Sequence, residues 1–284
     1  MTRTHAVSSL ILLLLLLAAM PVLAGPRDLV VVRPGGPTAS EEAGNQVRRL
    51  IREIAVRAGW PAESANAFYF NRAEDALAHI AGDRPGFILT TPGFYLAQRA
   101  ALGLDPLNQI LLAGEDTHRY HVVARKEGGP ASLEALKGAS LSGAPLAEPE
   151  FIERVVFGGQ FDFGTDIEAR HGRALSSLRK LCRGDLDAVI LDDTEHDGLP
   201  SLPFAGELVT IWSSPPLPNT GIFAVNGTAS PGDARALLSA TADFCSGDEG
   251  AAICETYGIT GFRPVPAGAF DELIATYGAG KGTP

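Results

Sequence analysis

Short apolar runs alternate with amphipathic segments along most of the chain. The runs in its first part are rich in β-branched and aromatic residues, which predicts strands. These predicted strands are residues 29–33, 67–70, 87–90 and 109–113. Ser40 begins a segment whose apolar residues recur at helical spacing as far as Gly59, which predicts a capped helix. Strands that alternate with helices require crossover connections, so the pattern predicts a largely parallel sheet between helices.

The alternation continues after residue 117 with a strand at 120–124 and a charged turn. Ser132 then begins a short apolar segment that Gly138 ends, which predicts a capped helix. The later predicted strands are residues 139–142, 188–191, 208–212 and 221–225. The later predicted helices are residues 149–157, 174–182, 233–244 and 248–257. The proline-rich residues 213–218 cannot continue the interior of a strand, so they predict a stiff link back to the first part of the chain.

The N-terminal residues have the pattern of a cleaved signal peptide. A weakly basic start precedes an unbroken apolar run at residues 10–19, and small residues end at Ala24. The run is shorter than the roughly 20 residues that a membrane span requires. We therefore expect a signal peptide at residues 1–24, export to a bacterial periplasm and no membrane insertion of the mature chain. Gly25 rather than a cysteine follows, so we expect no lipid anchor.

Composition and charge narrow the class of partner. Hydrophobic residues make up 45% and charged residues 20% of the chain, which is typical of a globular protein. The formal charge of −10 argues against binding to nucleic acid or to anionic lipid surfaces. Cys245 and Cys254 fall on consecutive predicted helices, and we expect them to pair in an oxidising compartment. Cys182 is then expected to be a buried free thiol.

Five blocks of sequence, taken in their order and spacing, carry a family resemblance. They are G-F-I-L-T-T-P-G-F-Y at 86–95, the segment 120–138, G-D-L-D-A at 184–188, W-S-S-P-P-L-P at 212–218 and Y-G-I-T-G-F-R-P at 257–264. Together they resemble the phosphate/phosphite/phosphonate-binding branch of type 2 periplasmic solute-binding proteins. The resemblance covers nearly the whole mature chain.

This resemblance implies an α/β fold of two lobes, each a mostly parallel sheet flanked by helices, with two crossings between them. The first lobe would comprise residues 25–116 and 215–284, and the second residues 117–214. A small, phosphate- or phosphonate-like ligand would close the lobes about a hinge for an ABC permease to recognise. We expect a monomer without a cofactor, a metal or catalytic residues.

Four candidate ligand-binding residues lie in the first lobe. Thr90 and Thr91 stand at a strand end directly before Pro92, where hydroxyls and free amides can hold an anion. Thr91 is equally suited to capping the helix that follows. Tyr95 lies one turn into that helix and faces either the cleft or the core. Arg33 ends the first strand beside two glycines. It is either a cation that binds an anionic ligand or an ordinary surface residue.

Four further candidates lie in the second lobe. His118 and Tyr120 occupy the expected first crossing between the lobes. His118 and His121 have a His-x-x-His spacing that could bind a metal, but a third ligand is not evident nearby. Asp192 and Asp193 follow a predicted strand. The resemblance places there an acid that meets a ligand amino group, and a solvated acidic loop is the alternative.

One segment departs from the family pattern. Where phosphonate binders carry a helix start rich in serine and threonine, residues 142–149 read S-G-A-P-L-A-E-P, and Glu148 would repel an oxyanion. The ligand is then different, or binding is lost. Two other hypotheses stay open: a periplasmic module with a degenerate cleft that serves a membrane sensor, and an enzyme on the same fold. The chain has no Gly-x-Ser-x-Gly nucleophile motif.

Overall fold

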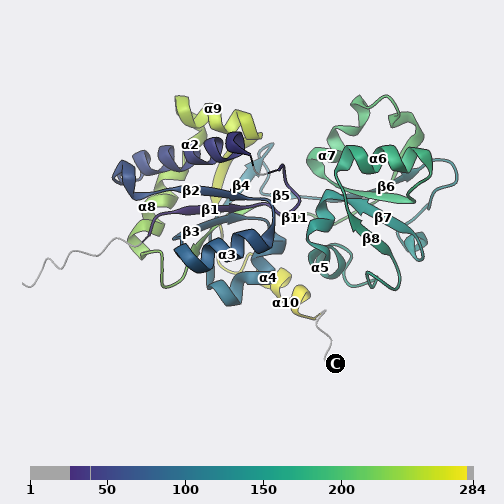
Figure 1. Ribbon diagram of the computed structural model, residues 1–284, viewed down its shortest axis with the longest axis horizontal. Helices are drawn as coiled ribbons and strands as arrows, with labels where there is room; N and C mark the ends of the chain where they lie inside the picture. The colour runs from purple at the N-terminus through teal and green to yellow at the C-terminus, as the bar shows by residue number, and fades with distance from the viewer. Residues whose placement is uncertain (1–25, 39, 280–284) are drawn as a thin grey trace, which may run out of the picture.

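Two sheets with flanking helices form two lobes that lie side by side (Figure 1). The computed structural model describes residues 26–38 and 40–279. The predicted signal peptide, residues 1–24, lies outside the described residues. The strands of the first sheet come from both ends of the described chain, and those of the second sheet come from its middle.

The first lobe contains a six-stranded sheet in the order β13-β4-β12-β3-β1-β2. Its strands are β1 (Leu29–Val32), β2 (Ala67–Phe70), β3 (Phe87–Thr90), β4 (Leu104–Leu112), β12 (Gly221–Val225) and β13 (Ile259–Pro264). Its helices are α2 (Glu41–Arg57), α3 (Ala73–Asp83), α4 (Pro92–Leu102), α8 (Pro231–Thr241), α9 (Asp248–Tyr257) and α10 (Asp271–Ala279). A 3₁₀ turn, Ala62–Ser64, precedes β2, and another, Phe244–Ser246, precedes α9.

Strand β1 shows why the first sheet is covered on both faces. All four of its residues are buried, and successive side chains of a strand point to opposite faces. Leu29 and Val31 pack in the cluster that contains α2, α8 and α9, whereas Val30 and Val32 pack in the cluster that contains α3, α4 and α10. An unbroken apolar strand therefore requires helices on each side.

The second lobe contains a five-stranded sheet in the order β10-β6-β9-β7-β8. Its strands are β6 (Tyr120–Arg125), β7 (Ser140–Gly143), β8 (Glu168–His171), β9 (Ala188–Asp192) and β10 (Leu208–Ser213). Its helices are α5 (Pro149–Phe151), which continues into the π-helical turn Ile152–Val156, α6 (Ala174–Arg183) and α7 (Asp193–Asp197). The 3₁₀ turns of this lobe are Glu134–Leu136, Ala144–Ala147, Leu199–Ser201 and Ala205–Glu207.

The sheets are mixed, which corrects the expectation of mostly parallel sheets. In the first sheet β1 pairs in parallel with β2 and β3, but β12 and β13 pair antiparallel with their neighbours. In the second sheet β7 pairs in parallel with β8 and β9, but β6 pairs antiparallel with β9 and β10. The chain crosses between lobes before β6 and before β12, and each of these two strands runs antiparallel to both of its neighbours.

The helix predicted after Ser132 does not form, which is a second correction. Only the 3₁₀ turn Glu134–Leu136 forms there, and no side chain caps it. Leu133 and Leu136 are both buried, so the apolar spacing reflects packing of this turn against the core. An apolar pair three residues apart fits one 3₁₀ turn as well as it fits an α-helix.

A two-stranded ribbon joins the lobes. β5 (Thr117–His118) pairs antiparallel with β11 (Leu217–Pro218), and both lie between the two sheets (Figure 1). On the side of the first lobe, the Asn219 amide donates to the carbonyl oxygens of Ile110, at 3.3 Å, and Glu115, at 3.0 Å. The two crossings thus run side by side, and the second of them contains the end of the proline-rich residues.

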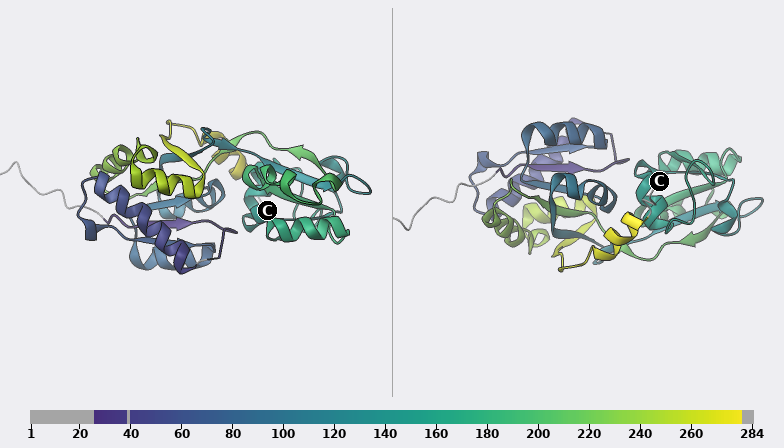
Figure 2. Two further views of the ribbon diagram at one scale, coloured as in Figure 1. Left: turned by 90° about the horizontal axis from the view of Figure 1, so that it is seen from above. Right: turned by 90° about the horizontal axis from the view of Figure 1, so that it is seen from below.

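Helix α10 makes a further contact between the lobes, and Figure 2 shows it at the end of the described chain, beside the junction. At its start Phe270 packs on Tyr95 of α4, with ring centroids 4.9 Å apart. Near its end the Tyr277 hydroxyl donates to Glu150 Oε2 in the second lobe at 3.0 Å. The Arg154 guanidinium lies 5.3 Å from the centroid of the same ring. The helix therefore restricts how far the lobes separate on this side.

Replacing Tyr277 with Phe is expected to lower the free energy of unfolding by about 1 kcal/mol, because it removes one hydrogen bond and keeps the ring. Urea unfolding of the two proteins measures the difference. Tyr257→Phe is the control, since the Tyr257 ring is more exposed and its hydroxyl has no hydrogen bond among the described residues. Equal losses in both variants would show that the Tyr277–Glu150 bond contributes nothing.

The cysteine pairing is confirmed: Cys245 and Cys254 form a disulfide between the 3₁₀ turn Phe244–Ser246 and α9. Cys182, on α6, is free and partly buried, and burial raises the pKa of its thiol. In the part of the chain that the structure describes, no helix has both the length and the apolar character of a membrane span.

Candidate functional site

A cleft of about 730 Å³ opens between the lobes, and both lobes contribute to its walls. The crossing ribbon forms part of the lining through Thr117 and His118. Six of the eight candidate residues line the cleft, namely Arg33, Thr91, His118, Tyr120, Asp192 and Asp193. They come from strand ends and helix starts of the two sheets, where open α/β folds bind ligands.

The other two candidates, Thr90 and Tyr95, do not line the cleft. Thr90 is fully buried in the sheet, and its hydroxyl donates to the Val32 carbonyl at 2.9 Å. Tyr95 is only 4% exposed, and its ring stacks on Phe223 at 4.5 Å. Thr90 is the last residue of β3 and its hydroxyl bonds within the sheet, whereas Thr91 follows the strand as the N-cap of α4 and reaches the cleft.

Thr91 caps α4 and also contacts the opposite lobe. Its hydroxyl oxygen accepts from the Phe94 backbone N–H at 3.3 Å and donates to Glu148 Oε1 at 2.8 Å. Gly93 leaves room for this carboxylate, because a Cβ at that position would lie 2.6 Å from Glu148 Oε1. Burial raises the pKa of the Glu148 carboxyl to about 7, although hydrogen bonds from Thr91 and from the Phe94 amide oppose the shift.

Sequence reasoning identified Glu148 as a residue that would repel an oxyanion, but not as a partner of Thr91. The two residues are 57 positions apart and belong to different lobes. The only sequence signal for the contact is the unusual S-G-A-P-L-A-E-P segment itself. No local pattern could have placed its glutamate against α4.

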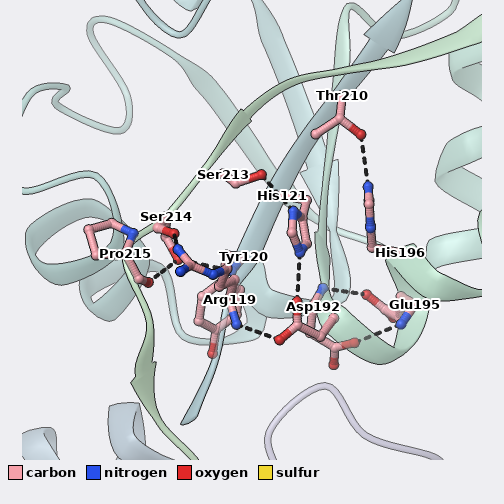
Figure 3. Close-up of polar contacts among 11 residues, drawn as sticks. Arg119, Tyr120, His121, Asp192, Glu195, His196, Thr210, Ser213, Ser214 and Pro215 are labelled. Carbon is pink, nitrogen blue, oxygen red and sulfur yellow. Dashed lines mark hydrogen bonds and ion pairs between the residues drawn. The ribbon is translucent and has the colours of Figure 1, made fainter.

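Asp192 and Asp193 both have structural partners at the start of α7. Asp192 Oδ1 accepts from the Glu195 backbone N–H at 2.9 Å, and Glu195 Oε2 accepts from the Asp192 backbone N–H at 3.3 Å, which forms a capping box (Figure 3). Asp193 Oδ2 accepts from the Arg119 backbone N–H at 2.7 Å. Burial, and next the adjacent Asp192 charge, raise the pKa of Glu195 to about 7. The acidic segment therefore forms the capped start of helix α7 at the cleft wall, where a solvated loop was the alternative.

A chain of polar contacts runs from Asp193 through His121 to Ser213. His121 Nε2 lies 2.7 Å from Asp193 Oδ1, and Nδ1 lies 2.8 Å from Ser213 Oγ (Figure 3). His196 stacks on His121 with ring centroids 3.9 Å apart. Ser213 is exposed and is not one of the residues that line the cleft. These contacts join β6, α7 and β10, and they hold the start of α7 against the second sheet.

His118 is the titratable group on the crossing ribbon. Burial lowers the pKa of its imidazole, and the nearby Asp192 and Asp193 charges oppose that shift. Its ring meets Tyr120 edge-on at 4.8 Å. Across residues 26–38 and 40–279, no group of three or more His, Cys, Asp or Glu side chains has the arrangement of a metal site.

Acidic side chains outnumber basic ones in the cleft. The acids in its lining are Glu115, Glu148, Asp192, Asp193, Glu195 and Asp197. The basic residues are Arg33 and Arg173, and the Arg173 guanidinium donates to Thr38 of the first lobe at 3.1 Å. This excess of acidic groups makes the electrostatic potential along the lining negative.

The two-lobed fold with an interlobe cleft is that of a binding protein of the type 2 periplasmic class. Residues 36–267 match the family model described as ABC transporter, phosphonate, periplasmic substrate-binding protein. The chain belongs to this family of periplasmic proteins, which is a substrate-binding family and not an enzyme family. No curated protein is significantly similar to the chain in sequence.

Solved structures confirm the fold. The Xanthomonas citri protein XAC2383, bound to ATP, is 16% identical with a TM-score of 0.72, and the match covers 89% of this chain and 98% of that one. A binding protein component of an ABC phosphonate transporter from Pseudomonas aeruginosa is 12% identical with a TM-score of 0.67, over 88% and 84%. PhnD1 from Prochlorococcus marinus, in complex with methylphosphonate, is 13% identical with a TM-score of 0.64, over 88% and 97%.

Proposed function

We propose that this chain is the periplasmic component of an ABC importer and captures a small solute between its lobes for the permease. The observation that carries the proposal is the cleft itself, whose walls come from both lobes and from the ribbon that joins them. A ligand that contacts both walls stabilises the closed arrangement, which a permease can distinguish from the open one. In this proposal residues 1–24 serve as the cleaved export signal.

The solute carries an amine, and any acidic group on it is directed toward Arg33. The acids Asp192 and Glu195 support this choice, because they lie on one wall of the cleft and Arg33 is the cation that faces them. Zwitterions such as 2-aminoethylphosphonate and amino acids satisfy both walls. Dianions that lack an amine are repelled by the acidic side chains, which outnumber the basic ones in the lining.

A thermal-shift panel on the mature protein tests this function. The ligands are 2-aminoethylphosphonate, amino acids and polyamines, with phosphate, methylphosphonate, alkylsulfonates and ATP as the acidic set. A ligand at about one hundred times its dissociation constant stabilises by about 2.7 kcal/mol. We expect a rise in melting temperature of several degrees with amine-bearing ligands, at roughly 2–4 °C per kcal/mol. A rise only with amine-free dianions would contradict the proposed ligand class.

Asp192→Asn is expected to weaken binding of the amine ligand roughly tenfold or more, because it removes one charge from the cleft wall. The folded state is expected to keep its stability within about 0.5 kcal/mol, since Asn caps a helix as well as Asp does. Isothermal titration measures the affinity and urea unfolding measures the stability. The matched control is Asp197→Asn, which removes the same charge from another lining residue that follows the capping box. Equal losses in both variants would mean that Asp192 acts only through overall charge.

A second candidate function is a module that presents its lobes to a membrane sensor. The Thr91–Glu148 hydrogen bond favours it, because this bond links the two lobes directly through their own side chains. If no compound in the panel shifts the melting temperature, this second function replaces the first.

A further inference from the structure

A carboxylate of the protein itself lies at the start of helix α4, at the wall of the cleft. Glu148 reaches from the second lobe to the first, where the Thr91 hydroxyl donates to its Oε1 at 2.8 Å. The Phe94 backbone N–H also stabilises the ionised carboxylate. We call this position, formed by the Thr91 hydroxyl and the Phe94 N–H, the α4 anion site.

The α4 anion site has the chemistry that an oxyanion ligand requires. The first backbone N–H groups of a helix lack partners within the helix, and the helix dipole favours negative charge there. Phosphate, phosphonate and carboxylate groups all bind at such positions. Here a carboxylate of the same chain already accepts the Thr91 hydrogen bond, and the Phe94 N–H, which also donates to Thr91 Oγ1, helps to stabilise it. The site is thus occupied by an anion that the protein supplies.

The surrounding residues accommodate Glu148 closely. A side chain at Gly93 would collide with the carboxylate and would lie 3.0 Å from the Cβ of Phe151. Phe151 is 2% exposed and belongs to the apolar cluster that continues from α4 into the second lobe. Pro149 directly follows Glu148 and begins α5, which fixes the backbone beside the carboxylate. The position of Glu148 therefore results from packing on both lobes.

We propose that Glu148 determines the ligand specificity of this cleft by occupying the α4 anion site, which excludes phosphate- and phosphonate-like groups from it. The exclusion has two causes, because the carboxylate fills the space and its charge repels a second anion. This inference rests on one part of the proposed function, namely that the cleft receives solutes. It does not depend on which amine-bearing solute the cleft binds.

Titration with inorganic phosphate and with methylphosphonate tests the proposal. At pH 8 most of the Glu148 carboxyl is ionised, because its pKa is about 7. Isothermal titration is carried out on wild type, Glu148→Ser and Glu148→Ala, both of which vacate the α4 anion site. We expect wild type to bind neither probe below millimolar concentrations, and at least one vacated variant to gain tenfold or more in affinity.

Two control variants separate occupancy from charge. Glu148→Gln removes the charge but still fills the α4 anion site, and its gain is expected to be smaller than that of Glu148→Ser. Glu115→Ser removes the same charge from another part of the cleft lining and is expected to gain less than threefold. An equal gain in Glu115→Ser and Glu148→Ser would overturn the proposal, because cleft charge alone would then explain exclusion.

Wild type provides an outcome that does not depend on the folding of any variant. Micromolar binding of methylphosphonate by wild type would overturn the proposal directly. The proposed function and this inference also fail in different ways. If wild type binds an amine ligand and neither vacated variant gains the probes, the inference is wrong and the function stands. If wild type binds no solute but a vacated variant gains phosphate, the inference stands and the proposed ligand class is wrong.

Discussion

Between pH 5 and pH 8, wild type is expected to lose about 2–5 kcal/mol of unfolding free energy relative to the double variant Glu148→Gln/Glu195→Gln. Burial raises the pKa of both glutamates from an ordinary value of 4.5 to about 7. The folded state therefore holds protons that the unfolded state has released. This stabilisation is fully present below about pH 4.5 and is lost as the pH rises through 7. Contact of both groups with the cleft solvent lowers the effect within this range.

Urea unfolding at pH 5, 6, 7 and 8 measures the effect. The comparison with the double variant is needed because burial lowers the pKa of His118 and His196, and these groups change stability in the opposite direction below pH 6.5. Glutamine retains a capping-box partner at position 195, so the α7 start is preserved. Parallel pH profiles for the two proteins would show that neither glutamate has a raised pKa in the folded state.

Removing the Cys245–Cys254 disulfide is expected to lower the free energy of unfolding by about 2–4 kcal/mol. The bond closes a loop between residues nine positions apart, and its loss lets the unfolded chain adopt more conformations. For a protein of this size the change corresponds to a fall in melting temperature of roughly 4–16 °C.

Thermal melting of Cys245→Ala/Cys254→Ala against wild type tests this value under non-reducing conditions. Cys182→Ala is the control, because Cys182 is free and only partly buried. Its melting temperature is expected to stay within a few degrees of that of wild type. If the double variant has the same melting temperature as wild type, the disulfide constrains a segment that is already ordered in the unfolded chain.

Local patterns predicted the secondary structure closely where local chemistry decides it. The strands β2, β3 and β12 have the predicted bounds, and Ser40 caps α2 through the Ala43 backbone N–H, as its position suggested. Strand β8 was missed because its residues, E-A-R-H, are mostly exposed and have no apolar run. Strand β4 was predicted too short, since it begins at Leu104 with mixed residues that pair with β12.

The candidate site was partly predictable for a similar reason. Strand ends and helix starts can be located in the sequence, and six of the eight residues chosen there line the cleft. Which side of its element a residue faces depends on what packs against it. Thr90 and Tyr95 face the interior, where the Thr90 hydroxyl bonds to the Val32 carbonyl and the Tyr95 ring stacks on Phe223.

The sequence by itself determined the apolar strands, the capped helices, the link of prolines and the family, because each depends on residues close together or on an ordered set of motifs. Only the tertiary structure decided the strand directions, the contact of α10 with the second lobe and the position of Glu148 at the start of α4. These features depend on residues that are distant in the chain and on which of several possible faces becomes buried. Glu148 illustrates the difference, since its charge is evident in the sequence but its partner Thr91 is not. Folding brings the two together because the lobes pack through Gly93 and Phe151.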